Sequence, residues 1–100
     1  MMPLHERLLS AGLNPWAIRE VAARHGATRV RVFGSFARGD SSSNSDIDLL
    51  VELAHGRSLL DLVAIKQDLQ DLLGRRVDVV TERSLSPYFR DAVCREAVAI

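Results

Sequence analysis

A polar loop between two short apolar segments constrains the fold of this chain more than any other feature. Residues 28–33 alternate in polarity and are rich in β-formers, which predicts a strand, and residues 46–53 predict another. A Gly-Ser pair at 34–35 closes the first strand, and an Asp-Ile-Asp triplet at 46–48 opens the second. The segment 34–39 predicts a turn with at most one helical turn, and the polar residues after it are too few to form a linker between domains.

Helical patterns surround these two strands. Apolar residues at helical spacing predict helices over 4–11, 15–25, 59–73 and 87–98, and a third strand is predicted over 76–81. Asn14 and Ser58 are the expected N-caps of the second and third helices, the latter in a capping box with Asp61. We expect Trp16 to cover the core, with a place at an interface as the alternative, and we expect the third helix to bury Leu62, Ile65, Leu69, Leu72 and Leu73. This order of elements indicates an α/β (α+β) domain with a small mixed β-sheet and helices packed on one face.

Length and composition indicate one domain that spans residues 1–100. The chain holds 13 basic and 13 acidic residues, and a net charge of zero gives no electrostatic reason to expect binding to nucleic acid or to a membrane. Its apolar runs are far shorter than the roughly 20 residues of a membrane span, and the N-terminus has no apolar signal core. The single cysteine, Cys94, excludes an intrachain disulfide, and we therefore expect a cytoplasmic protein.

The Gly-Ser pair is the first candidate for a binding site. Gly34 permits a backbone conformation and a close approach that a side chain would block, and Ser35 adds a hydroxyl group. Amides at a turn or at the start of a helix can point at phosphate oxygens, so the pair suits a phosphate group. An isolated Gly-Ser pair is more often only a turn, and it gains weight here from the acidic residues that follow.

Three acidic residues on predicted strands form the second candidate site. Asp46 and Asp48 are two positions apart, so their carboxylates leave the same face of one strand. A hard divalent cation such as Mg²⁺ would relieve their repulsion. Asp78 lies in another apolar strand, and if the two strands are neighbours, three carboxylates converge, which is enough for two Mg²⁺ ions that bridge a triphosphate and an attacking hydroxyl. The alternatives are a solvated strand end for the pair and an exposed edge position for Asp78, with Glu52 as the next candidate for the third carboxylate.

Together these residues resemble a known signature. The Gly-Ser pair, followed after ten residues by Asp-x-Asp, is similar to the signature of the DNA polymerase beta-type nucleotidyltransferase superfamily. Residues 32–39 with 45–51 resemble the minimal nucleotidyltransferase (MNT) branch of that superfamily, and the resemblance extends to Asp78 and to the final segment 95–98. It covers most of the chain and implies a polymerase-beta-type nucleotidyltransferase fold.

The resemblance implies a role for each site residue. The Gly-Ser pair, Gly34 and Ser35, would hold the triphosphate of ATP. Arg38 occupies the position of the family's usual arginine, where it either contacts phosphate or forms a salt bridge that ties the turn down. The Asp-x-Asp pair would bind both Mg²⁺ ions, whereas Asp78 would bind the catalytic one and help to deprotonate the acceptor hydroxyl.

The resemblance also implies a partner protein. In this family the partner is commonly a HEPN-domain ribonuclease toxin, and the minimal transferase acts as its antitoxin by moving AMP from ATP onto a tyrosine hydroxyl near the toxin's active site. A chain of 100 residues has no room for the domain with which larger relatives grip the acceptor, so we expect a partner to supply the acceptor. This expectation is compatible with a homo-oligomer or a hetero-oligomer.

Two other functions stay open at this point. The chain could be a binding module that neutralises its toxin by contact alone, although three intact acidic residues speak against a purely degenerate enzyme. It could also be a transferase for a small molecule or RNA, although the absence of an acceptor domain and of a basic face argues against this function.

Overall fold

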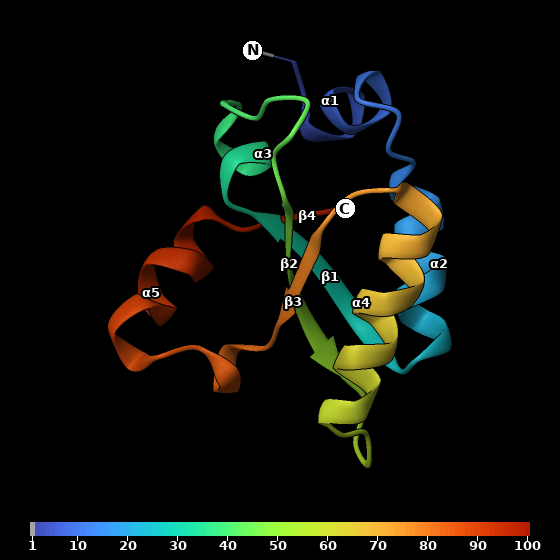
Figure 1. The fold of residues 1–100 in the computed structure, drawn as a ribbon. Helices are drawn as coiled ribbons and strands as arrows, with labels where there is room; N and C mark the ends of the chain where they lie inside the picture. The colour runs from blue at the N-terminus through green and yellow to red at the C-terminus, as the bar shows by residue number, and fades with distance from the viewer. Residues whose placement is uncertain (1) are drawn as a thin grey trace.

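The strand that begins within the Asp-Ile-Asp sequence is one of the two inner strands of the sheet. In the structure, a computed structural model that describes residues 2–100, β2 (Ile47–Leu53) pairs antiparallel with β1 (Ala27–Phe33) and parallel with β3 (Val77–Val80). A short strand, β4 (Val98–Ala99), pairs antiparallel with the other edge of β1, which gives the order β3-β2-β1-β4 (Figure 1). The small mixed sheet expected from the sequence is therefore confirmed.

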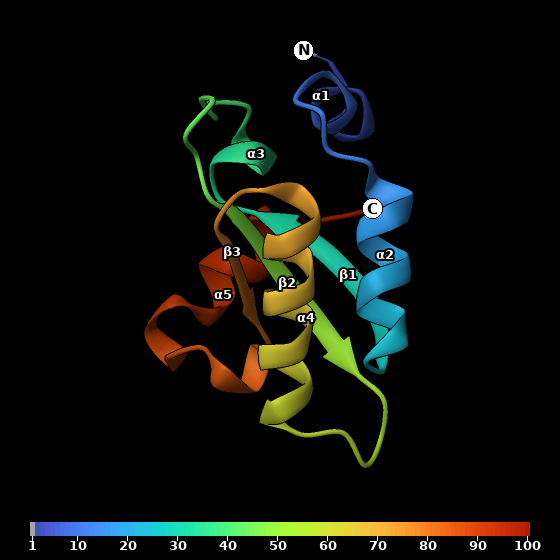
Figure 2. The same ribbon diagram turned by 45° about the vertical axis from the view of Figure 1, so that its right-hand side comes forward.

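Alternation along the strands gives the sheet one strongly apolar face. Two helices, α2 (Pro15–Arg24) and α4 (Leu59–Leu73), cover this face (Figure 1, Figure 2). The buried apolar residues of the strands are Val30, Val32, Ile47, Leu49, Val51 and Val77, and those of the two helices are Ile18, Val21, Ala22, Leu62, Ile65 and Leu69. Removal of this apolar surface from water is the main term that stabilises the fold.

Local capping signals define the ends of these two helices. The side chain of Asn14 accepts hydrogen bonds from the backbone N–H groups of Trp16 and Ala17, at 2.9 and 3.2 Å. Ser58 and Asp61 form the predicted capping box at the start of α4, and Gly74 ends this helix in the left-handed conformation. Both predicted N-caps are therefore present. Each contributes about 1 kcal/mol to stability.

The other face of the sheet is partly covered by the C-terminal part of the chain. A 3-10 turn, η1 (Glu82–Ser84), and α5 (Pro87–Glu96) lie on the side of the sheet opposite to α4 (Figure 1). The turn η1 contacts β2 there, and Leu50 is completely buried on this face. The buried Arg31 of β1 donates a hydrogen bond to the half-exposed Glu82 at 2.9 Å, which ties η1 to the sheet.

Two short helices lie at the end of the sheet where β1 finishes and β2 begins. These are α1 (Leu4–Ser10) and the single-turn helix α3 (Ser35–Arg38), which contact each other (Figure 1). Leu4 and Leu8 of α1 and Phe36 of α3 are buried and extend the core in this direction. The turn expected between the first two strands therefore contains one helical turn, as the sequence allowed.

The C-terminal segment differs from the sequence prediction. The pattern predicts a helix through residue 98, whereas α5 ends at Glu96 and the chain continues as β4. Ala97 has the extended angles φ −65° and ψ 136°, and the N–H of Ile100 donates to the carbonyl of Val30 at 3.3 Å. The edge of β1 explains the difference, because its backbone groups need hydrogen-bond partners and β-branched Val98 favours an extended conformation.

Two apolar residues predicted to face the core are exposed. Trp16 is 55% exposed, with its ring in edge-to-face contact with the ring of His5 at a centroid distance of 5.6 Å. Leu72 is also 55% exposed, because at the last turn of α4 it is Leu73 that packs against the core. In residues 2–100, no helix is both long enough and apolar enough to span a membrane.

Candidate active site

The predicted phosphate-binding turn lies where β1 ends. Gly34 has φ +74°, and Ser35 directly after it is the first residue of α3. A Cβ atom at position 34 would overlap with Oδ2 of Asp48 and would lie 3.0 Å from its Cγ. A side chain is therefore disfavoured twice, by the positive φ and by the contact with Asp48. The fold brings the glycine and the second aspartate of the sequence motif into direct contact.

The three acidic residues, Asp46, Asp48 and Asp78, form an acidic row at the start of two strands. Asp48 of β2 is directly opposite Asp78 of β3 in the parallel register, and Phe33 of β1 is opposite Asp48 on its other side. Asp46 immediately precedes β2, and all three acidic side chains are partly buried. The prediction that the strands carrying Asp48 and Asp78 are neighbours is thus confirmed. Glu52, the alternative third carboxylate, lies near the far end of β2 and outside this row.

Asp48 is the electrostatic centre of the row. Its pKa is raised to about 6, first by burial and then by the negative charges of Asp78 and Asp46, with a further contribution from a hydrogen bond that the protonated Asp48 can donate to Asp78. The charge of Arg38 acts in the opposite direction on this pKa. Lys66 approaches the row from α4, with Nζ 4.0 Å from Oδ1 of Asp78. The row is therefore short of positive charge.

This donor set fits a divalent cation by its chemistry. Mg²⁺ prefers carboxylate oxygens, and a cation among Asp46, Asp48 and Asp78 would offset both the burial of the Asp48 charge and its repulsion by the other two, which together raise the pKa of Asp48. Within residues 2–100, no three Asp, Glu, His or Cys side chains are already arranged around one point as metal ligands. The fit therefore rests on the type, number and repulsion of the carboxylates.

The raised pKa of Asp48 predicts a pH-dependent cost to folding in the metal-free chain. Because the folded state binds this proton more tightly than the unfolded state, the contribution of Asp48 to stability should fall as pH rises from about 4 to about 6. Asp48→Asn removes this cost. The quantity to compare is the difference in free energy of unfolding between the variant and the wild type. We expect this difference to be larger at about pH 7.5 than at about pH 4, by about 1–2 kcal/mol after allowance for solvent screening. Urea titrations with EDTA measure this difference, and an equal difference at both pH values contradicts it.

Arg38 is bound by two carboxylates beside the turn. Its Nη1 donates to Oε1 of Glu96 at 2.8 Å, and its Nε donates to Oδ2 of Asp40 at 3.3 Å. The other oxygen of Glu96, Oε2, accepts a hydrogen bond from the backbone N–H of Gly34 at 2.8 Å. The salt bridge that the sequence left open as one role of Arg38 is therefore present. Glu96 lies in the segment 95–98 to which the family resemblance extends, but no role was predicted for it, because the sequence alone does not show that the final helix contacts the turn.

Two further arginines support α3 and the loop that follows it. Nη2 of Arg7 donates to the carbonyl oxygens of Phe36 and Ala37, at 2.8 and 3.2 Å. The guanidinium of Arg75 lies 5.4 Å from the centre of the Phe36 ring, and its Nη1 donates to the carbonyl of Ser45 at 3.2 Å. Both contacts join segments distant in sequence, which is why sequence reasoning did not find them.

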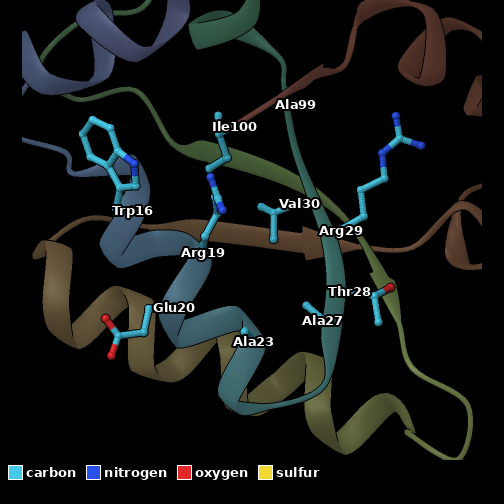
Figure 3. A pocket seen from close by; sticks show the side chains of 10 residues that line it. All are labelled: Trp16, Arg19, Glu20, Ala23, Ala27, Thr28, Arg29, Val30, Ala99 and Ile100. Carbon is cyan, nitrogen blue, oxygen red and sulfur yellow. The ribbon is translucent and has the colours of Figure 1, made fainter.

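Two hollows on the surface lie away from the acidic row. One of about 520 Å³ lies between α2, β1 and the C-terminal residues, and its lining includes Trp16, Arg19 and Ile100 (Figure 3). Another of about 380 Å³ lies beside α3 and is lined by Arg7, Arg75 and serines of the 41–45 loop. None of the predicted acidic residues lines either hollow.

Known proteins resemble this chain over most of its length. The model of the family described as Nucleotidyltransferase domain matches residues 15–100. A protein of Methanocaldococcus jannaschii that is provisionally named a protein adenylyltransferase is 45% identical over 80 residues, which cover 80% of this chain and 86% of that protein. The protein adenylyltransferase MntA of Thermococcus cleftensis is 38% identical over 82 residues, which cover 82% of this chain and 83% of that protein.

Solved structures share the fold as well. A structure provisionally described as a minimal nucleotidyltransferase is 49% identical, with a TM-score of 0.78 over 99% of this chain and 97% of that chain. A chain from a toxin–antitoxin crystal structure with AMP-PNP is 27% identical, with a TM-score of 0.75 over 87% of this chain and 72% of that chain. The similarity thus includes the sheet, the turn and the acidic strands.

Proposed function

Because the chain belongs to the Nucleotidyltransferase domain family, we propose that it transfers AMP from ATP to a partner toxin and acts as the antitoxin of that pair. The relatives named as protein adenylyltransferases and the toxin–antitoxin structure with AMP-PNP support this proposal. The proposed acceptor is a tyrosine hydroxyl of a HEPN ribonuclease toxin, the proposed cofactor is Mg²⁺ as two ions, and the proposed place of action is the cytoplasm.

One observation carries the proposal. Asp48 is paired with Asp78 in the sheet and is in contact with Gly34, so the acidic row and the phosphate-binding turn form one site. A nucleotidyltransferase needs this combination, because the charge of the triphosphate and the charge that develops during transfer must both be neutralised at the same place.

Each residue has a proposed part in nucleotide binding. The hydroxyl of Ser35 and the guanidinium of Arg38 bind phosphate oxygens, and Gly34 leaves room for Asp48 beside them. Asp46, Asp48 and Asp78 would hold Mg²⁺, which when bound would neutralise the triphosphate and make the acceptor hydroxyl more acidic.

The proposed reaction is an in-line displacement at the α-phosphorus of ATP. The acceptor oxygen forms a bond to this phosphorus, the bond from phosphorus to the oxygen that bridges to the β-phosphate breaks, and pyrophosphate leaves with that electron pair. Asp78 takes the proton of the acceptor hydroxyl, while Arg38 stabilises the charge on pyrophosphate. β3 is an edge strand, so Asp78 is open to a side chain that a partner presents.

Exposed apolar side chains favour a protein partner. Leu59, Leu60 and Val63 are exposed on α4, and Tyr88 and Phe89 are exposed on α5. Groups of this kind supply buried apolar area in protein interfaces. They also fit the second candidate function, in which the chain neutralises its toxin by contact without modifying it.

Co-expression with the partner toxin separates the two functions. We expect intact-mass spectrometry of the purified toxin to show the added mass of AMP at a tyrosine, and we expect this mass to be absent when the antitoxin carries Asp46→Asn with Asp48→Asn. The conservative control is Asp71→Asn, an exposed acidic residue of α4 outside the row. A tight complex with an unmodified and inhibited toxin supports neutralisation by contact and contradicts the transfer proposal.

Binding of Mg-ATP should stabilise the chain. A ligand present at about 100 times its Kd adds about 2.7 kcal/mol, which is a rise of several degrees in Tm for a domain of this size. Thermal unfolding with millimolar Mg-ATP measures this rise, with Mg²⁺ alone and with ATP plus EDTA as controls. A Tm that does not change with Mg-ATP contradicts the proposed nucleotide site.

Asp78→Asn should separate binding from transfer. Asp46 and Asp48 can still hold a metal–triphosphate complex, but the third carboxylate and the proton acceptor are lost. We expect calorimetry to detect substantial Mg-ATP binding, while the rate of transfer falls by about two orders of magnitude or more. Near-normal transfer would show that Asp78 is only a strand residue.

A further inference from the structure

We propose that Glu96 is a positioning residue of the nucleotide site, which acts by fixing Arg38 and the Gly34 turn in the orientation that receives the triphosphate. This inference rests on the proposed function, because it assigns Arg38 to phosphate. It concerns a residue at the end of α5, distant in sequence from the turn that it contacts.

The contacts of Glu96 are unusual for a surface ion pair. One carboxylate oxygen accepts from Nη1 of Arg38 and the other accepts from the backbone N–H of Gly34, both at 2.8 Å. Its side chain is 25% exposed, compared with 52% for Arg38. Charge-assisted bonds to a side chain and to a backbone amide together fix geometry more firmly than an exposed pair of long side chains does.

These contacts leave donors of Arg38 available. A guanidinium has five N–H donors in one plane, and here Nε faces Asp40 while Nη1 faces Glu96. Among residues 2–100, no hydrogen bond engages Nη2 of Arg38. Glu96 orients the plane through Nη1 at 2.8 Å, while the exposed Asp40 holds Nε more loosely at 3.3 Å, so the direction of Nη2 depends chiefly on Glu96. A phosphate that binds there does not have to order a free arginine side chain.

The bond to Gly34 extends the same effect to the turn. The N–H of Gly34 is bound to Glu96, so the residue with the positive φ is fixed on one side by Glu96 and on the other by its contact with Asp48. Ser35 follows directly, so its hydroxyl group is presented from a turn with a defined backbone. Glu96 therefore connects the last helix with both proposed phosphate ligands.

Calorimetric titration of Mg-ATP into the full chain tests this role. Glu96→Gln keeps an acceptor for the Gly34 amide but removes the charge that holds Arg38. Asp91→Asn is the matched control, because it removes one negative charge from the exposed side of the same helix. We expect Glu96→Gln to weaken Mg-ATP binding about tenfold, the scale of one lost charge-assisted hydrogen bond, whereas Asp91→Asn leaves binding unchanged.

A double-mutant cycle then asks whether Glu96 acts through Arg38. We expect Glu96→Gln to have no further effect on Mg-ATP binding in an Arg38→Ala background. Glu96→Asp keeps the charge but is one methylene too short to reach both partners, and it should also weaken binding. This variant preserves a test if Glu96→Gln fails to fold, which circular dichroism reports.

Several outcomes overturn the proposal. If Glu96→Gln bound Mg-ATP more tightly than Asp91→Asn did, Glu96 would be competing with phosphate for the hydrogen-bond donors of Arg38 and the turn. Additive losses in the cycle would mean that Glu96 acts independently of Arg38. Equal binding by the wild type and all Glu96 variants would leave Glu96 without a role in the nucleotide site. If the wild type does not bind Mg-ATP, it is the proposed function that fails.

Discussion

Replacement of Asp46 and Asp48 together by Asn is expected to abolish nucleotide transfer without unfolding the chain. The two side chains are proposed to hold both Mg²⁺ ions, whose contribution to charge neutralisation is several kcal/mol, so transfer should fall by at least about a thousandfold. Folding should survive or improve in metal-free buffer, because the variant removes the buried charge of Asp48 and its repulsion by Asp78 and Asp46, which together raise the pKa of Asp48. Transfer is measured with radiolabelled ATP and the purified partner, and stability is measured by urea titration.

The matched control for this variant is Asp68→Asn with Asp71→Asn on α4. Both are exposed acidic residues outside the row, so the control removes the same charge without touching the site. It should retain transfer close to that of the wild type. A site variant that retained normal transfer would contradict the two-metal proposal, and one that unfolded would contradict the claim that the acidic row costs stability.

Gly34→Ala is expected to damage both stability and transfer. The new Cβ would overlap with Oδ2 of Asp48, and the positive φ of position 34 disfavours any side chain. Relief of the overlap must move either the turn or Asp48, and a displacement of about 1 Å in a catalytic site can cost about a hundredfold in rate. We expect transfer to fall by at least this factor, as measured with the purified partner.

Gly12→Ala is the control for a positive φ without steric overlap. Gly12 has a similar φ of +78°, but a Cβ there would have no atom within 4 Å. Gly12→Ala should therefore show only the cost of the left-handed conformation, about 1–2 kcal/mol, with normal transfer. Gly34→Ala should exceed this loss by about 1–3 kcal/mol, because position 34 combines overpacking against Asp48 with φ +74° and ψ −152°, a backbone conformation that essentially only glycine adopts. Equal stability losses, or normal transfer by Gly34→Ala, would show that the contact with Asp48 is easily relaxed.

The elements that sequence reasoning predicted correctly depend on local interactions. The cap at Asn14 joins residues two and three positions apart, and the capping box at Ser58 joins it to Asp61. Alternation in β1 and β2 follows from the geometry of a strand, which sends successive side chains to opposite faces. Such features are visible in a short window of sequence, so no knowledge of the rest of the fold is required.

The wrong predictions all depend on what lies next to a segment in space. The tail after Glu96 is compatible with a helix by its own composition, and it becomes β4 because β1 has an edge to pair with. Trp16 is apolar and lies at the start of a helix, yet it remains largely exposed. Intrinsic propensity and periodicity do not report whether a partner surface is present, so tertiary context overrides them.

Residue types and their spacing were enough to predict the chemistry of the proposed site: a Gly-Ser turn, an Asp-x-Asp pair and a further aspartate on an apolar strand, at the spacing of nucleotidyltransferases. Three features were visible only in the folded chain: Asp48 lies opposite Asp78 on the adjacent strand, Gly34 has no room for a side chain, and Glu96 binds Arg38 from 58 residues away. Residue types and spacing decide which groups can bind phosphate or metal, whereas sheet order and register decide which of these groups meet.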